Sequence, residues 1–517
     1  MTTTCPAHNE RDMKRRCPMA AVMTLCAALV AVTAPAAGQD TSSITAAELA
    51  AFDAYVTQAV KDWNLAGLAI ALVHEDSTIF ARGYGVIEVG KSAPVTEHTR
   101  FAVGSTTKAM TTAALALLVD EGKLSWDDRV IDHLPQLRLH DPYATRELTV
   151  RDLLTHRSGL PGTDLFWTRL DYDLDEMLYR LRFVEPVSPF RTTWNYQNVV
   201  YAIGGALVEE LSGMRWHDFV RTRIFAPLGM NESEPLDAGI IEKPNVAVPH
   251  DATNDSLHTV PKRTTDAVAS VGSVWSSVSD MAKWMRFMLD SARVDGRPLI
   301  QPETFREIVA PQIRAPLAIY GSLALVKPTL LTYALGWFVH DFDGDIVWMH
   351  TGSINGMSAL VGLLPNRRFG VVVLINRDHA EVRHALMYRA FDLAGGNPER
   401  DWSRDVLALQ ESGQRPTASA RPAVTPPSLP LERYAGTYRH GAYGTLLVRL
   451  EAGQLRAQFE SNPAFALEHR DFETFRTADA PASYGFTVTF DPDGTGQIVA
   501  ARLYGASFER LRERVDR

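Results

Sequence analysis

Cysteine is almost absent from this chain of 517 residues, which carries only Cys5, Cys17 and Cys26 and none beyond them. Structural disulfides, thiol catalysis and cysteine-based metal sites are therefore excluded from the rest of the chain. An excess of basic residues is also lacking, because 52 Lys and Arg stand against 61 Asp and Glu, for a net charge of −9. This balance gives no basic footprint for nucleic acid and no reason to expect adhesion to an anionic membrane surface.

The sequence also lacks an apolar run long enough to anchor it in a membrane. Residues 20–34 are apolar, but about 15 residues are too few to span a bilayer comfortably. With the basic residues 14–16 before them and the small residues 34–38 after them, they predict a signal peptide over 1–37. Met13 is an alternative start, because residues 1–12 make a poor leader. We expect a periplasmic or secreted protein without a stable membrane anchor after cleavage.

The remaining chain has ordinary globular composition, with 46% hydrophobic and 22% charged residues. Helical stretches and strand-like runs alternate up to about residue 396, which predicts a first domain over 38–398. A segment rich in Pro, Ala and Ser predicts a linker over 399–431. Short alternating runs over 432–517, with a turn at Asp493-Gly494, predict an all-β domain, either a small barrel or a sandwich.

Hydrophobic periodicity predicts the elements of the first domain. Strands are expected as a hairpin over 68–73 and 77–84 and as closing strands over 346–349, 358–364 and 369–375. Apolar helices are expected over 109–121, followed by Gly122, and over 199–211, closed by Ser212-Gly213.

Two familiar catalytic patterns do not apply. Residues 85–92 (GVIEVGKS) match a phosphate-binding loop formally, but Ala93-Pro94-Val95 follows where a helix is required, so a hairpin turn is the better interpretation. No G-x-S-x-G elbow exists, which removes the usual α/β-hydrolase signature. No cluster of metal ligands appears either, and we expect no metal or cofactor.

Ser105 and Lys108 are the strongest candidates for chemistry. They lie directly before the helix predicted over 109–121, and a spacing of three places both on one helix face. A serine becomes a nucleophile when a nearby base takes its proton, and a lysine serves where burial lowers its pKa. The helix N-terminus would favour negative charge on an attacked carbonyl oxygen. For S-x-x-K alone, an N-cap serine beside a surface lysine is the more common explanation.

Two further motifs support the chemical interpretation. Tyr196-Gln197-Asn198 precedes the second apolar helix, where a phenol near the serine relays a proton and an amide holds the substrate. His350-Thr351-Gly352-Ser353 follows a predicted strand, where a glycine admits a substrate backbone and His350 joins the proton network. Each motif alone is more often structural: a packed aromatic with a capping Asn, and a satisfied core or edge histidine.

In this order and spacing, the motifs at 105–108, 196–198 and 350–352 resemble those of the penicillin-recognising serine hydrolases. The similarity is greatest to the group that contains class C β-lactamases, a D-Ala-D-Ala carboxypeptidase, D-aminopeptidases and related esterases. It covers about residues 45–395 and includes the segment 148–161. The best-known form of this signature pairs S-x-x-K with S-D-N and K-T-G, where this chain has Y-x-N and H-T-G.

The resemblance implies a fold and a set of roles. The fold is an α/β (α+β) sandwich of antiparallel sheet flanked by helices plus an all-α cluster, with the site between them. The last domain resembles a lipocalin-like β-barrel, which either borders the site or serves as a spacer or partner-binding unit. The resemblance implies that Ser105 is the nucleophile that forms an acyl-enzyme and that Lys108 and Tyr196 share the work of general base and acid. It implies that the N–H groups of Ser105 and Ser353 form the oxyanion hole. The further residues that it implies in substrate binding are Asn198, His350, Thr351 and Gly352. The loop with His156 and Ser158 is implied to be structural.

The histidine at 350 weakens the expectation of β-lactam hydrolysis, because β-lactamases usually carry a lysine there that helps hold the substrate carboxylate. We therefore expect an exported serine hydrolase that acts on an amide or ester, above all a D-amino-acid peptide. The alternatives are a carboxylesterase with weak or no β-lactamase activity and a non-catalytic module that binds or senses peptidoglycan. The expected partner is a small-molecule or peptide substrate, cell-wall fragments included, and not nucleic acid.

Overall fold

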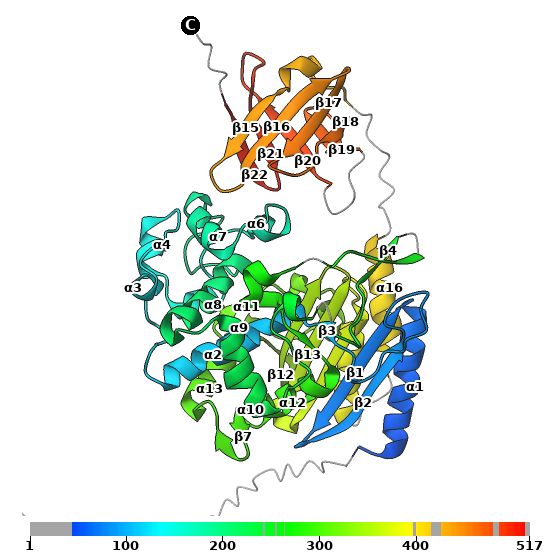
Figure 1. Ribbon diagram of the computed structural model, residues 1–517. Coiled ribbons are helices and arrows are strands. Elements are labelled where there is room, and N and C mark those ends of the chain that lie inside the picture. Colours follow the sequence, from blue (N-terminus) through cyan, green and yellow to red (C-terminus); the bar gives the residue numbers. More distant parts are fainter. Residues whose placement is uncertain are drawn as a thin grey trace, which may run out of the picture. The chain divides into compact units, whose positions relative to one another are not determined.

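The computed structural model describes residues 44–240, 243–253, 256–262, 264–395, 400–414, 425–478 and 485–511 (Figure 1). Contacts divide the chain into the units Met1–Ser43 and Ile44–Arg517. The predicted signal peptide over 1–37 lies outside the described residues. Within the described ranges, no helix is both long enough and apolar enough to cross a bilayer.

An antiparallel sheet forms the centre of the first domain, and eight of the described strands belong to it. The predicted hairpin is confirmed, because Leu68 pairs with Tyr84 across it. In spatial order the strands are β2 (Ser77–Gly85), β1 (Gly67–His74), β14 (Phe369–Ile375), β13 (Met357–Leu364), β12 (Asp345–Ile354), β11 (Phe338–Phe342), β10 (Leu331–Tyr333) and β9 (Ile313–Arg314). The predicted closing strands correspond to β12, β13 and β14, of which β12 is longer than expected.

Both faces of the sheet are covered by helices, which is why its central strands are nearly continuous apolar runs. Leu68, Ile70 and Leu72 of β1 pack into one core with α1 (Ala46–Asp62), α15 (Val382–Gly395) and α16 (Trp402–Gln414). Ala69 and Ala71 point to the other face and pack with α12 (Val278–Leu289). Figure 1 shows α1 and α12 on opposite sides of β1.

The linker predicted over 399–431 starts later than its composition indicated. Residues 402–414 form the helix α16, which packs against α15, and its Trp402 and Val406 are buried in the second core. The correction has a simple cause: the apolar residues at 402 and 406 are one helical turn apart, and burial of that stripe stabilises a helix. Residues 415–424 lie outside the described part of the chain.

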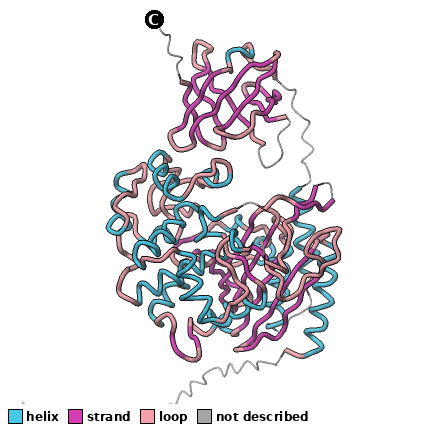
Figure 2. The backbone as a smooth tube through the Cα atoms, viewed as in Figure 1, coloured by secondary structure: helices cyan, strands magenta, loops and turns pink. Residues whose placement is uncertain are grey.

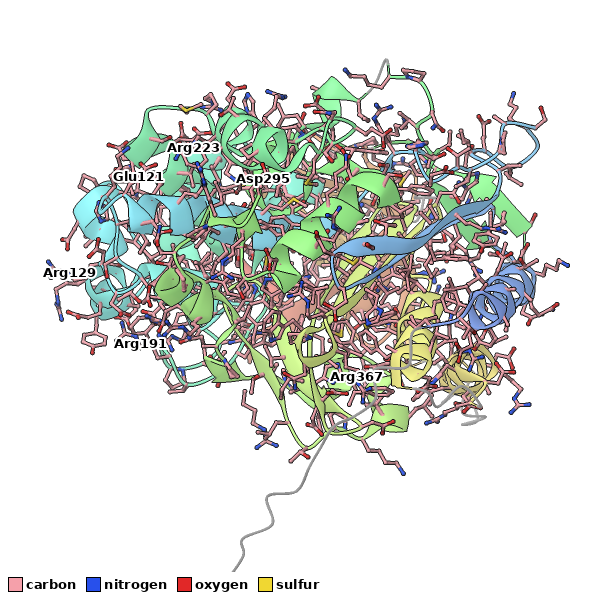
Figure 3. All side chains as sticks on the ribbon, turned by 90° about the horizontal axis from the view of Figure 1, so that it is seen from below. Glu121, Arg129, Arg191, Arg223, Asp295 and Arg367 are labelled. Carbon is pink, nitrogen blue, oxygen red and sulfur yellow. The ribbon has the colours of Figure 1, made fainter. Side chains whose placement is uncertain are left out.

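The all-α cluster is built around α2 (Thr107–Asp120), whose residues 107–118 are all buried, and α8 (Asn198–Ser212). Both helices were predicted, and α8 ends at Gly213, whose φ of 70° is the left-handed conformation expected there. Just beyond α2, Glu121 pairs with Arg223 at 2.6 Å, and Figure 3 labels both residues. The surrounding helices are α3 (Val130–His133), α4 (Pro142–Glu147), α5 (Val150–Leu154), α6 (Leu165–Thr168), α7 (Leu174–Arg180), α9 (Trp216–Val220), α10 (Ala226–Leu228), α11 (Ala269–Gly272) and α13 (Pro302–Val309).

Residues 85–92 form a turn and not a phosphate-binding loop. The Ile87 N–H donates to the Ala93 carbonyl at 2.9 Å, and Val86 forms an antiparallel bridge with Pro94. Lys91 therefore lies in a turn with no helix after it, as its context indicated.

The C-terminal strands close into a barrel in which sequence neighbours pair antiparallel and β15 pairs with β22 (Figure 2). Tyr434, Phe475 and Phe490 pack edge to face in its interior. The prediction of an all-β domain is confirmed, and of its two expected forms the structure has the barrel. Its strands are β15 (Gly436–His440), β16 (Gly444–Glu451), β17 (Gln454–Phe459), β18 (Phe465–Asp471), β19 (Thr474–Thr477), β20 (Thr487–Pro492), β21 (Ile498–Leu503) and β22 (Ala506–Arg510).

Candidate active site

Ser105 lies in the 3₁₀ turn η1 (Gly104–Thr106), directly before α2. Two glycines allow this turn to approach β12. A Cβ on Gly104, whose φ is +53°, would lie 2.9 Å from the Ser353 nitrogen, and a Cβ on Gly352 would collide with the Val103 carbonyl. Gly352 was expected to admit a substrate backbone, but in the structure it admits the turn that carries Ser105.

The motif at 350–353 lies inside β12 and not after it. β11 pairs with β12 only as far as Met349, whereas β13 follows β12 to Ile354. The prediction ended the strand at 349 with the apolar run, but pairing with β13 keeps the following polar residues extended. Beyond Met349, the edge of β12 opposite β13 has no strand partner among the described residues, and Ser105 lies next to this stretch.

Lys108 is fully buried and its ammonium nitrogen has three oxygen neighbours. Nζ lies 3.0 Å from Ser105 Oγ, 2.7 Å from Asn198 Oδ1 and 3.1 Å from the Val271 carbonyl of α11. Burial lowers the pKa of Lys108 from 10.5 to about 7, against an opposing effect of the Asp164 carboxylate. A large share of this lysine is therefore unprotonated near neutral pH, and its amine already contacts the candidate nucleophile.

Tyr196 belongs to the same cluster, and its phenol is close enough for the Ser105 side chain to act on its pKa. Burial raises the pKa of Tyr196 well above 10, with Ser105 acting in the opposite direction. The Lys108 nitrogen lies 4.9 Å from the centre of the Tyr196 ring. Tyr196 is thus a neutral phenol at the pH where Lys108 loses its proton, which separates an acid from a base.

Asn198 is the first residue of α8, and its amide bridges two charged groups. Its Oδ1 accepts from Lys108, and its Nδ2 donates to both carboxylate oxygens of Asp164, at 3.0 and 3.1 Å. Asp164 precedes α6 and was not expected from the sequence. A single acid between small residues and an aromatic segment has no distinctive spacing, so no sequence signal pointed to it.

His350 differs from its expected role. Its side chain is buried, Nδ1 lies 2.6 Å from the Thr351 carbonyl, and Nε2 lies 3.0 Å from the Tyr333 hydroxyl. Because a carbonyl only accepts, Nδ1 carries the hydrogen and Nε2 accepts from Tyr333. Burial lowers the pKa of His350 to about 3, so the ring is neutral. Both nitrogens have partners other than Ser105, so the neutral ring does not relay the serine proton directly and carries no fixed positive charge.

Thr351 and Ser353 are held by side chains behind the strand. The Thr351 hydroxyl lies 2.9 Å from the Tyr320 hydroxyl, and Arg383 donates to Ser353 Oγ at 2.8 Å and to the Gly352 carbonyl at 2.7 Å. Arg383 is itself buried. Beside Ser353 is a cavity of about 130 Å³, lined by Trp167, Thr168, Thr264, Thr265, Ser353, Ile354, Asn355, Asp378 and His379.

His156 is a structural residue, as the resemblance implied. It is fully buried, and its Nδ1 accepts the Gln197 N–H at 3.1 Å. Its ring packs against Tyr196 with centroids 4.3 Å apart. His156 therefore fixes the segment that carries Tyr196 and Asn198. In the ranges that the structure describes, no three His, Cys, Asp or Glu side chains are placed to hold a metal ion.

Comparison with known proteins adds to this geometry. The sequence model of the family described as Beta-lactamase matches residues 52–395, and a domain of unknown function (DUF3471) matches residues 420–515. Unguisins hydrolase ungD of Aspergillus violaceofuscus is 27% identical over 467 residues, which are 81% of this chain and 81% of that protein. Penicillin-binding protein 4 of Amycolatopsis lactamdurans is 27% identical over 63% of this chain and 83% of its own length.

Solved structures share the fold. The octameric penicillin-binding protein homologue from Pyrococcus abyssi has a TM-score of 0.62 at 20% identity and covers 90% of this chain and 100% of its own. A class C beta lactamase from Rhodobacter sphaeroides has a TM-score of 0.54 at 22% identity, over 69% of this chain and 99% of its own. The expected combination of an α/β sandwich with an all-α cluster and a C-terminal barrel is thereby confirmed.

Proposed function

The chain belongs to the Beta-lactamase family, and from this premise we propose that it is a serine hydrolase in which Ser105 forms an acyl-enzyme with an amide or ester. The observation that carries the proposal is the contact of 3.0 Å between Ser105 Oγ and a buried lysine whose pKa is about 7. An exposed lysine would be protonated at neutral pH and could not take the serine proton. The relatives named as a hydrolase and as a penicillin-binding protein support the same class.

The hydrogen bonds of Lys108 support its role as the base. A neutral amine has two hydrogens and one lone pair. Two of its three neighbours, Asn198 Oδ1 and the Val271 carbonyl, only accept hydrogen bonds, so they take both hydrogens. The lone pair is then directed at Ser105, whose hydroxyl donates to it. When Ser105 attacks a carbonyl carbon, its proton passes to Lys108 as the new C–O bond forms.

Tyr196 is suited to deliver a proton to the leaving group. It is a phenol at neutral pH, and it lies in the cluster of Ser105 and Lys108, next to which the leaving group departs. The amide N–H groups of Ser105 and Ser353 would stabilise the oxyanion, in keeping with the approach of η1 to β12 at Gly104 and Gly352. Lys108 then returns the serine proton to the Tyr196 phenolate and is neutral again when water attacks the acyl-enzyme. The water proton passes to Lys108 and from there to Ser105 Oγ as the bond between Ser105 and the acyl carbon breaks.

The charges near Ser105 bear on the substrate. Lys108 is buried, His350 is neutral, and Arg383 is bound behind β12 and paired with Glu381 at 3.0 Å. None of these three groups offers the fixed, exposed cation that a free substrate carboxylate needs. We propose a D-amino-acid peptide as substrate. Its cleaved amide need not lie next to a free carboxylate of the peptide, because these three groups offer no cation to bind one. The same observation favours a carboxylesterase as the second candidate.

We also propose that the protein is exported to the periplasm or secreted, which is the expectation from the signal peptide predicted over 1–37. We propose as its partner a peptide or small-molecule substrate, cell-wall fragments included. The third candidate, a non-catalytic peptidoglycan-binding module, has less support. A lysine buried at 0% exposure beside a serine is costly to a fold, and a binding module has no use for a base there.

A substrate panel tests the proposed function. Wild type, Ser105→Ala and the control Ser77→Ala, which alters an exposed serine of β2, are compared on p-nitrophenyl esters, a C-terminally blocked D-alanyl peptide, a D-Ala-D-Ala peptide and a chromogenic cephalosporin. We expect wild type and Ser77→Ala to hydrolyse the blocked peptide or the esters, and Ser105→Ala to hydrolyse neither. Wild-type rates in Ser105→Ala would refute the nucleophile, and an inactive wild type would favour the binding module.

A further inference from the structure

We propose that Asp164 is a positioning residue: it holds the Asn198 amide in the orientation that presents oxygen to Lys108, and so keeps the lone pair of Lys108 directed at Ser105. The inference rests on the proposed function and adds a residue to it. It stands on the contacts of Asp164, which is half-buried at the start of α6. Its two oxygens lie 3.0 and 3.1 Å from Asn198 Nδ2, and Oδ1 also accepts from the Trp167 indole at 3.2 Å.

The chemistry of a carboxylate decides how the Asn198 amide is turned. An asparagine side chain has an oxygen on one side and an NH2 group on the other, and the two orientations have nearly the same shape. A carboxylate only accepts hydrogen bonds, so the NH2 group must face Asp164. The oxygen is thereby left for Lys108, 2.7 Å away.

The opposite orientation would disable the base. If the Asn198 NH2 group faced Lys108, it would donate to the lone pair of the neutral amine, because an NH2 group has no acceptor to offer. Only the Val271 carbonyl would then take a hydrogen from Lys108, and Ser105 would lose its proton acceptor. The carboxylate of Asp164 accepts hydrogen bonds from Asn198 and Trp167, so its effect on Lys108 and Ser105 runs through Asn198 and through its charge.

The charged and titratable groups around this chain of contacts come from several elements. The Asp164 carboxylate favours the protonated form of Lys108, against the larger effect of burial on its pKa. The pKa values of His156 and His350 are lowered first by burial and then by the charge of Lys108, which keeps both rings neutral. Tyr196, Tyr201 and Tyr333 have pKa values raised by burial, and burial with the Asp164 charge raises the pKa of Tyr443 to about 12. Between pH 5.5 and 9, Lys108 is therefore the group of this set that titrates.

Two substitutions separate the orientation from the charge. Asp164→Leu removes both the acceptor for Asn198 and the negative charge, whereas Asp164→Asn removes the charge and keeps an oxygen that can face Asn198. Asp175→Asn is the matched control, because Asp175 is an exposed acid on α7. The readout is the second-order rate constant for labelling Ser105 with a fluorescent fluorophosphonate, measured from pH 5.5 to 9. Labelling forms a bond between Ser105 Oγ and phosphorus, releases fluoride and passes the serine proton to Lys108, and it needs no knowledge of the substrate.

We expect the wild-type rate constant to rise with pH through about 7 and then to level off. Asp164→Leu should lower the plateau by about 10- to 100-fold, a part of what a positioned general base supplies. Both Asp164 variants should move the rise to lower pH, by about one unit, because the charge that favours protonated Lys108 is gone. Asp164→Asn should keep most of the plateau, and Asp175→Asn should follow wild type.

The outcomes separate the two proposals. A wild type that is not labelled overturns the proposed function, and this inference with it. A labelled wild type together with an unchanged plateau in Asp164→Leu overturns the positioning role of Asp164 and leaves the proposed function intact, whether or not the rise moves with the lost charge. If Asp164→Leu does not fold, Asp164→Asn decides: a plateau lowered by about 10-fold or more, although an oxygen can still face Asn198, refutes the inference.

Discussion

Burial of Lys108 should make the stability of the protein depend on pH in a way that a single substitution removes. In the unfolded chain this lysine has a pKa near 10.5, and in the folded protein its pKa is about 7. Between these values the unfolded chain binds one more proton than the folded one. Stability is therefore lost as pH falls from 10.5 towards 7 and is regained as pH rises.

The size of the effect follows from the two pKa values. At 1.36 kcal/mol per pH unit, and with folded Lys108 half protonated at pH 7, the folded protein gains about 2 kcal/mol between pH 7 and pH 9 from this group alone. Lys108→Met removes the titrating group and keeps a side chain of similar length. The acceptors left behind, Asn198 Oδ1 and the Val271 carbonyl, do not titrate in this range, so their cost is the same at both pH values.

Urea unfolding followed by tryptophan fluorescence measures this difference. All ten tryptophans precede residue 403, so the signal reports on the first domain and not on the barrel. From pH 7 to pH 9, wild type should gain about 2 kcal/mol in the free energy of unfolding relative to Lys108→Met. Lys91→Met, which removes an exposed lysine, should follow wild type. If the difference in the free energy of unfolding between wild type and Lys108→Met is the same at pH 7 and pH 9, Lys108 keeps its ordinary pKa. That result would refute Lys108 as the base.

Three further substitutions test other parts of the structure. Gly352→Ala places a methyl group against the Val103 carbonyl, so we expect a loss of about 1–3 kcal/mol in urea unfolding together with slower labelling of Ser105; wild-type behaviour would contradict the close approach. Tyr333→Phe leaves His350 Nε2 without its donor and should lower the free energy of unfolding by about 1–2 kcal/mol. An unchanged Tm would contradict that hydrogen bond. Burial raises the pKa of Asp392 to about 6, so its ionised form destabilises the fold above that pH. Asp392→Asn should therefore have a larger free energy of unfolding than wild type at pH 8, and this difference should be about 1 kcal/mol smaller at pH 5. A difference that does not change with pH would refute the raised pKa.

The sequence predicted the architecture well where burial imposes a strong pattern. The runs 68–73 and 369–375 are apolar on both faces because helices cover both sides of the sheet, and the alternation over 498–503 marks a barrel strand with one buried face. Patterns of this kind are local, and the chain shows them without its partners. The helix over 402–414 was missed because its short apolar stripe lies beside a Pro-rich segment, whose composition dominated the interpretation.

The candidate site was predictable in its members but not in its contacts. Ser105, Lys108, Tyr196 and Asn198 stand in recognisable motifs, and the structure brings their side chains together. The role of Asp164 depends on a contact across 34 residues, which no spacing announces. The neutral state of His350 depends on burial and on Tyr333, and neither is visible at position 350 in the sequence.

Mapping the covalent adduct tests the central claim most directly. Wild-type protein is incubated at pH 8 with a fluorophosphonate, digested, and the modified peptide is sequenced by mass spectrometry, with Ser105→Ala treated in the same way. We predict one modified residue, Ser105, and no adduct in the alanine variant. An adduct on another serine, or labelling that persists in Ser105→Ala, would contradict the assignment of Ser105 as the nucleophile.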